Sequence, residues 1–99
     1  MNTSKELIND SRYKDFETIR KTKLEMNNGK TLNVSIEFLM KKLREEHIEM
    51  VTAYYNYRDC RIYNYTQTKE LKKQQFETEL ADLANMCYLV YMRLRGFKK

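Results

Sequence analysis

The fold is decided by the stretch SIEFLMKKLREEHIEMVTAYYNY (residues 35–57), whose apolar residues recur at helical steps of three, four and seven. These residues are Ile36, Leu39, Leu43, Met50 and Tyr54, with Met40, His47 and Val51 beside them. The pattern predicts an amphipathic helix of about six turns with one broad apolar face. Ser35 is expected to cap its N-terminus, and Val34 and Leu39 stand where a hydrophobic staple would form.

Acids interrupt this helix in the run Glu45-Glu46-His47-Ile48-Glu49. At about 100° per residue, Glu46 lies about 60° from the direction of Leu43, and Glu49 lies about 120° away on the same side. An acid at the edge of an apolar face is costly unless something compensates its charge. A divalent cation would compensate it well, because hard cations take carboxylate oxygens as ligands.

The composition is that of one small helical domain spanning residues 1–99. The chain has no proline and only two glycines, Gly29 and Gly96, which favours long uninterrupted helices. A core of this size is modest, so association between copies would help to stabilise it. No apolar run is long enough to cross a bilayer, and residues 1–10 are polar, with neither signal peptide nor firm order expected.

Net charge and cysteine content indicate partner and cellular setting less specifically than the acidic motif indicates a metal site. The net charge of +5 fits nucleic acid, an anionic small substrate or nothing specific, but the basic residues are spread along the chain, which argues against nucleic acid. Cys60 and Cys87 lack metal-ligand spacing, and Cys87 is expected in the core. A reduced, cytoplasmic setting is the simplest account of both thiols.

Three to four helices are expected, in an all-α antiparallel bundle completed by oligomerisation. Their predicted ranges are 1–9, 11–24, 35 to about 57, and from 67–70 to 95, with a turn at 27–30 and a C-terminal stop at Gly96. Between Arg58 and Thr68 the pattern weakens, so a loop or a frayed helix end is predicted there, with a continuing helix as the alternative. The last helix should bury a stripe composed of Phe76, Leu80, Leu83, Cys87, Val90 and Leu94.

The last helix repeats the acidic anomaly. Glu79 lies about 40° from the direction of Leu83, and Asp82 lies about 100° away on the same side. Packed against each other, the two helices could bring four carboxylates into one small volume, where they would repel unless cations sat among them. The pattern suggests a Mg²⁺ site that holds a polyphosphate. On the residues alone, a solvated charged face stays open as the alternative.

The two motifs, Glu45-Glu46-His47-Ile48-Glu49 and Glu79-Leu80-Ala81-Asp82, resemble the EExxE…ExxD signature of the MazG-like all-α nucleoside triphosphate pyrophosphohydrolases. The flanking residues 35–44 and 83–86 are similar to those of the small phage, bacterial and archaeal members. The resemblance implies a homo-oligomeric helical bundle, a dimer or tetramer, that cleaves a nucleoside triphosphate to the monophosphate and pyrophosphate with Mg²⁺ or Mn²⁺. The family's catalytic metal ligands map onto Glu46, Glu49, Glu79 and Asp82.

Weaker substrate contacts are assigned to Glu45, Asn85, Arg93 and Lys73. Glu45 matches the first motif position but points away from the core on the helical wheel. His47 is expected to be a core or interface residue, since Mg²⁺ prefers oxygen. The segment 54–73 between the motifs is long, basic and tyrosine-rich, which leaves open a non-catalytic phage or mobile-element protein that sequesters a nucleotide or inhibits a host protein.

Overall fold

The computed structural model describes residues 3–26, 34–62 and 66–97, and within them the chain forms α-helices and no strands. The helices are α1 (Thr3–Asn9), α2 (Ser11–Met26), α3 (Ile36–Ile62) and α4 (Thr66–Leu94). The predicted all-α fold is therefore confirmed. Among the described helices, none combines the length and the apolar character that crossing a bilayer would need.

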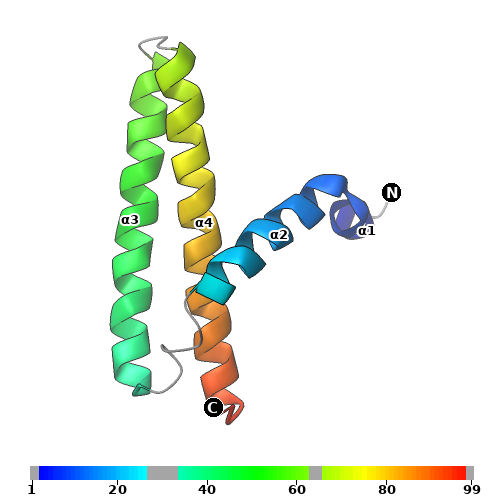
Figure 1. The fold of residues 1–99 in the computed structure, drawn as a ribbon, viewed down its shortest axis with the longest axis vertical. Coiled ribbons are helices and arrows are strands. Elements are labelled where there is room, and N and C mark those ends of the chain that lie inside the picture. Colours follow the sequence, from blue (N-terminus) through cyan, green and yellow to red (C-terminus); the bar gives the residue numbers. More distant parts are fainter. Residues whose placement is uncertain (1–2, 27–33, 63–65, 98–99) are drawn as a thin grey trace.

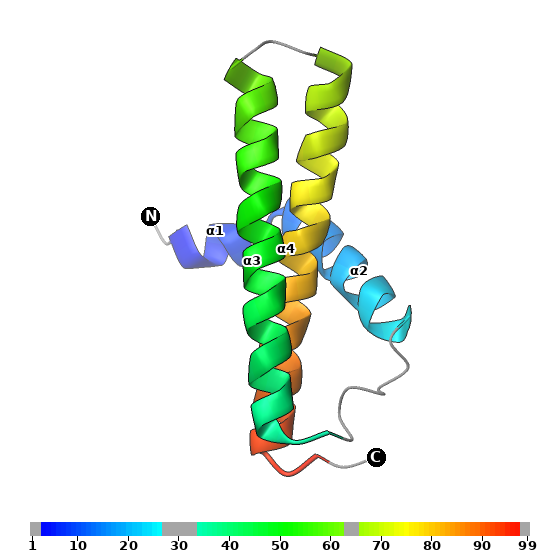
Figure 2. The same cartoon turned by 90° about the vertical axis from the view of Figure 1, so that its left-hand side faces the viewer.

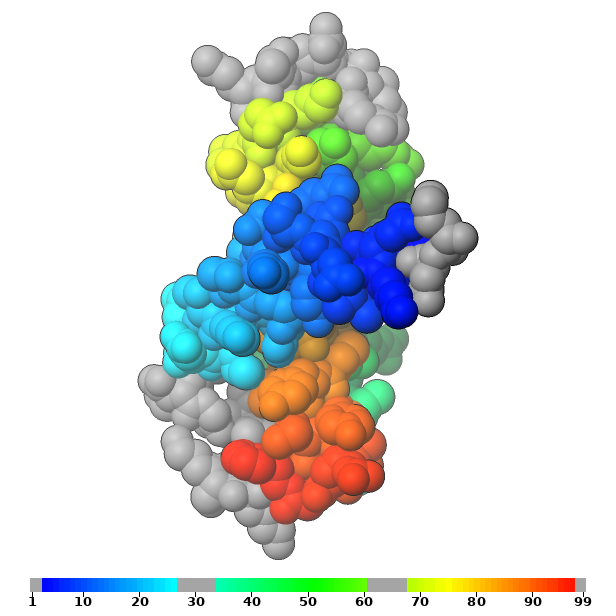
Figure 3. All heavy atoms as spheres, turned by 90° about the vertical axis from the view of Figure 1, so that its right-hand side faces the viewer, coloured from blue at the N-terminus to red at the C-terminus, as the bar shows by residue number. Residues whose placement is uncertain are grey.

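The two long helices, α3 and α4, run antiparallel and side by side as a hairpin (Figures 1 and 2). Helix α2 crosses α4 obliquely and packs on it, while α1 lies at the far end of α2, at a distance from the hairpin. Figure 3 shows α2 lying across the face that α4 turns away from α3. Helix α4 is thus packed on two sides, so side chains from both α3 and α2 can reach the acidic residues on it.

The start of α3 and the end of α4 are capped by the residues that the sequence predicted for these roles. The backbone N–H of Phe38 donates to Ser35 Oγ at 3.1 Å, so Ser35 is the N-cap of α3. At the other end Gly96 has φ +81°, and the N–H groups of Gly96 and Phe97 donate to the carbonyls of Arg93 and Met92 at 3.1 and 3.0 Å. This is a Schellman motif, and it ends α4.

Helix boundaries differ from the sequence predictions mainly after Tyr57. Helix α3 continues to Ile62, so the predicted loop or frayed end is wrong for residues 58–62, where the alternative of a continuing helix is correct. Helix α4 begins at Thr66 and ends at Leu94, within a residue of the predicted limits. The predicted N-terminal helix is present as α1, with no buried residue. The predicted turn at 27–30 lies outside the described residues.

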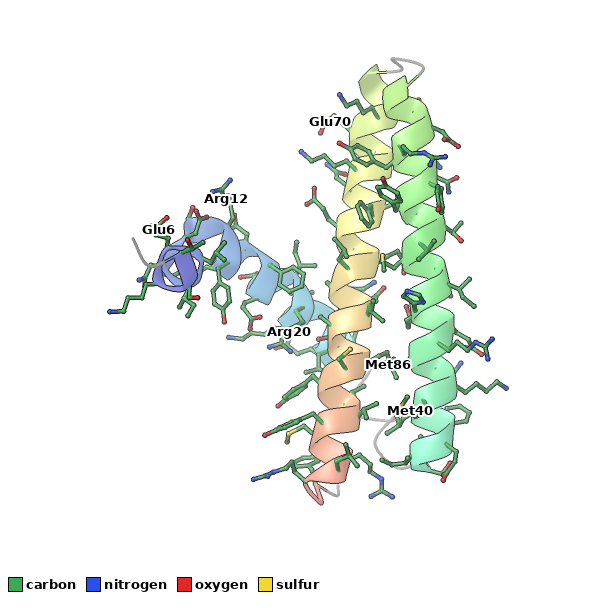
Figure 4. All side chains as sticks on the ribbon, turned by 180° about the vertical axis from the view of Figure 1, so that it is seen from behind. Glu6, Arg12, Arg20, Met40, Glu70 and Met86 are labelled. Atoms are coloured by element: carbon green, nitrogen blue, oxygen red, sulfur yellow. The ribbon has the colours of Figure 1, made fainter. Side chains whose placement is uncertain are left out.

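Apolar side chains gather at two heights of the hairpin, in a buried core near the start of α3 and in a partly exposed aromatic cluster toward the tip. Near the start of α3, Leu39, Met86 and Leu89 are buried together, and Val34, Leu43 and Leu24 of α2 pack against them. Figure 4 shows Met86 at this level. Toward the hairpin tip, Phe76 lies 5.5 Å from the ring of Tyr54 and 6.3 Å from that of Tyr57. The acidic motifs fall between these two parts.

The predicted apolar stripe of α4 is partly wrong. Leu94 is 69% exposed and Leu80 37%, and Cys87 is also exposed, whereas Ala81, Asn85 and Met86 are buried. The reason is that α4 packs against both α3 and α2, so its buried arc is wider than that of a helix with one partner and is rotated toward α2. On α3 Leu39 is buried as predicted, whereas Met40 and Tyr54 of the predicted face are 47% and 41% exposed. His47 is exposed in the single chain, so its predicted place in the core is wrong and an interface position stays a prediction.

Candidate metal centre

Three of the four predicted ligands converge where α3 faces α4. One carboxylate oxygen each from Glu46, Glu79 and Asp82 lies within 4.8 Å of the others. Glu79 and Asp82 are three residues apart, so they share one side of α4, and that side meets Glu46 across the hairpin. All three side chains are half-buried.

Burial and mutual repulsion destabilise the ionised forms of the three clustered carboxylates. Burial raises the pKa of Glu46 to about 7, and the nearby charges of Glu49, Asp82 and Glu79 add to the rise. Burial also raises the pKa values of Glu79 and Asp82 above their ordinary range, and in both cases the carboxylate of Glu49 contributes. The protein therefore holds together acids that a positive charge would stabilise in their ionised form.

Two oxygens of the cluster lack hydrogen-bond partners among the described residues. Glu46 Oε2 and Glu79 Oε2 are both shielded from solvent, and neither accepts a hydrogen bond. Such atoms are costly in a folded protein unless a ligand satisfies them. Carboxylate oxygens are the donors that Mg²⁺ and Mn²⁺ prefer, so the residues present fit a divalent cation of that class.

Helix α2 adds a cation that the sequence analysis did not identify. Lys23 Nζ lies 3.5 Å from Asp82 Oδ1, and the two side chains are 33% and 23% exposed. Together with Met26 and Glu46, these residues line a cavity of about 200 Å³. The charge of Lys23 lowers the pKa values of Asp82 and Glu79, which opposes the effect of burial.

Helix α2 is held in place by a buried amide one turn along α4 from Asp82. Asn85 is 2% exposed, and its Nδ2 donates to the carbonyl oxygen of Arg20 at 2.9 Å. Its Oδ1 accepts from Arg20 Nη1 at 3.3 Å, and the same guanidinium binds Glu17 at 2.9 Å. Figure 4 shows Arg20 at the junction of α2 with α4. Asn85 was predicted as a substrate contact, but both its Oδ1 and its Nδ2 are hydrogen-bonded to Arg20.

Glu49, the fourth predicted ligand, lies beside the cluster rather than inside the group of three. Its side chain is exposed, yet its charge raises the pKa values of all three clustered acids. Glu49 and Glu79 line one end of a groove of about 570 Å³ between α3 and α4. Further along, the groove is lined by Thr52, Asn56, Gln74, Gln75 and Thr78, with Ile48 and Leu71 among its apolar members.

The weaker candidates lie elsewhere. Glu45 forms an ion pair with Lys42 at 3.3 Å along α3. Lys73 is exposed on α4, toward the tip from Glu79. Arg93 is half-buried near the end of α4, and its Nε lacks a partner among the described residues. Eleven residues separate it from Asp82, which amounts to roughly 16 Å along a helix, so these two residues do not form one site within the chain.

Comparison with known proteins adds no relative: no family model, no curated protein and no solved structure matches this chain.

Proposed function

We propose that this protein is a Mg²⁺-dependent nucleotide pyrophosphohydrolase, which cleaves a nucleoside triphosphate to the monophosphate and pyrophosphate. The observation that carries the proposal is the convergence of Glu46, Glu79 and Asp82 within 4.8 Å, with two buried oxygens unpartnered. The sequence signature EExxE…ExxD, in which these residues are embedded, supports the same activity.

The residues divide the chemical tasks between them. Glu46, Glu79 and Asp82 supply the negative charge that holds the ion, and bound Mg²⁺ would neutralise phosphate charge and activate water. Glu49 stands at the edge of the centre, exposed and outside the group of three, where its carboxylate can accept a proton from water. The water oxygen then bonds to the α-phosphorus, the bond from that phosphorus to the bridging oxygen breaks, and pyrophosphate leaves.

The groove beside the centre suits a nucleoside. Its volume of about 570 Å³ falls in the range of small-molecule sites. The side-chain amides of Asn56, Gln74 and Gln75 offer both donors and acceptors, which the edge of a base requires. A triphosphate whose phosphates reach Glu79 at one end of the groove would therefore extend its base toward these amides.

Assembly and location follow as parts of the same proposal. Large apolar side chains are exposed outside the groove, including Tyr91 at 56% and Met40 at 47%, and a homo-oligomer (dimer or tetramer) would cover them. Light scattering would measure this. Cys60 and Cys87 are both free, which fits a cytoplasmic protein.

Pyrophosphate release from the common and modified nucleoside triphosphates, with and without Mg²⁺ or Mn²⁺, tests the function. We expect metal-dependent turnover that falls at least about 100-fold in Glu79→Gln, because a ligand carboxylate is lost. Glu77→Gln is the matched control, since this exposed acid lies on the same helix outside the cluster. Absence of turnover with every nucleotide would contradict the proposal, and nucleotide binding without turnover would favour the non-catalytic alternative.

A further inference from the structure

Lys23 reaches the carboxylate centre from a helix that contributes no acid to it. Its ammonium lies 3.5 Å from Asp82 Oδ1, and the cavity between them is also lined by Glu46. Both acids belong to the group whose oxygens lie within 4.8 Å of one another. The position that a divalent ion would take among these oxygens is therefore bordered by a positive charge of the protein itself.

The backbone that carries Lys23 is fixed more firmly than its ammonium. Asn85 binds Arg20 through two hydrogen bonds, and Lys23 and Asp82 are each one turn from that contact, on α2 and α4. The two pairs form successive rungs between the helices, so the Asn85 contact sets the register of Lys23. By contrast, the ammonium of Lys23 is 3.5 Å from Asp82 Oδ1, which is longer than the about 2.7–2.9 Å of a typical charge-assisted hydrogen bond.

A lysine with a long ion pair on a fixed helix can exchange one partner for another. Its four-carbon stem moves the ammonium by several ångströms while α2 stays docked, and lysine is a common phosphate ligand because it acts as a compact point charge. A divalent ion among the carboxylates would repel the ammonium from Asp82. A phosphate bound to that ion would attract it, and the cavity lined by Lys23 and Met26 leaves room for the movement.

We propose that Lys23 is a built-in exchangeable cation of this centre: its ammonium neutralises part of the carboxylate charge through Asp82 in the free protein, and it moves to a phosphate oxygen when a metal-bound polyphosphate arrives. The proposal rests on the metal-dependent function proposed above and adds a residue to its substrate site. Without a polyphosphate, Lys23 competes with the metal ion for the carboxylates. With a polyphosphate, Lys23 and the metal ion bind the same ligand.

Opposite effects on two binding constants test the proposal. In Lys23→Met we expect calorimetry to show Mg²⁺ binding about 3- to 10-fold tighter, because the competing charge is gone. With Mg²⁺ saturating, we expect inorganic triphosphate to bind about 10-fold more weakly, because a phosphate contact is lost. Lys23→Arg should restore triphosphate binding, and Lys21→Met, an exposed lysine on the same helix, should change neither constant.

The outcomes separate the two proposals. If the wild-type protein binds no Mg²⁺ or Mn²⁺, the metal-dependent function fails, and the role of Lys23 fails with it. If the wild-type protein binds the metal but Lys23→Met weakens both Mg²⁺ and triphosphate, Lys23 is only structural and this proposal alone is overturned. Nitrogen NMR of the Lys23 ammonium in the wild-type protein needs no variant: we expect its signal to shift with Mg²⁺ and again with triphosphate, and an unchanged signal would refute the exchange.

Discussion

Replacing Glu46 by glutamine tests the strain in the carboxylate cluster. The pKa of Glu46 is about 7 in the folded protein, against an ordinary value of 4.5. As pH rises, the unfolded chain therefore loses this proton first, and stability falls between about pH 4.5 and 7. Converting the whole pKa difference into free energy of unfolding gives a loss of about 3 kcal/mol. Because Glu46 is partly exposed and solvent screens its charge, we expect a loss of about 1–2 kcal/mol.

We expect Glu46→Gln to be more stable than the wild-type protein at pH 8 without divalent ions, by about 5–10 °C in melting temperature. The gain should shrink toward zero near pH 5, where Glu46 is protonated in the folded protein and the wild-type penalty is absent. Adding Mg²⁺ at pH 8 should stabilise the wild-type protein and have little effect on the variant, because binding to the folded state raises stability by mass action. Thermal unfolding followed by circular dichroism measures all three effects.

The control for this experiment is Glu45→Gln, one residue earlier on α3. Glu45 pairs with Lys42 at 3.3 Å, and both side chains are substantially exposed, so its loss should change stability by less than about 1 kcal/mol. A Glu46→Gln protein that is less stable than wild type at pH 8, or whose gain is the same at pH 5, would refute the electrostatic reasoning.

Three further predictions concern the packing that positions the centre, and chemical denaturation measures each. Leu39→Ala removes a fully buried side chain and should lower the free energy of unfolding by about 3 kcal/mol; a loss under about 1 kcal/mol would show that this cluster is not the core. Asn85→Ala removes both hydrogen bonds to Arg20, whose guanidinium keeps its ion pair with Glu17, and should cost about 1–3 kcal/mol; an unchanged stability would mean that α2 is docked by other contacts. Ser35→Ala removes the N-cap of α3 and should cost about 1 kcal/mol, whereas Ser35→Gly should cost only a few tenths.

The sequence was sufficient where a local rule decides the structure. The cap at Ser35 and the stop at Gly96 depend on side chains and backbone within one turn, and both are present as predicted. The spacing of Glu46, Glu79 and Asp82 relative to apolar residues on their own helices predicted a shared volume, with a solvated face as the alternative, and these three do meet, whereas Glu49 lies outside the group. A helical wheel contains this information because it fixes side-chain directions along a single element.

Features that depend on how two distant helices meet were not predictable in this way. The register of α2 on α4 is set by Asn85 and Arg20, which are 65 residues apart, and nothing near Lys23 in the sequence indicates that it reaches Asp82. The exposure of Cys87 has the same origin, because the face that α2 covers rotates the buried arc of α4. The extension of α3 to Ile62 lacks a strong apolar pattern, but no glycine or proline stops it.

The position of the acids between the aliphatic cluster and the aromatic cluster bears on how the hairpin opens. Leu39, Met86 and Leu89 pack at one level and Tyr54, Tyr57 and Phe76 at another, with charged side chains between them. Cooperativity is weakest where apolar contacts are interrupted, so amide hydrogens near the tip should exchange by local openings that leave the lower half protected. A divalent ion binding between the levels would couple them, and the spread of exchange rates along α3 and α4 would narrow.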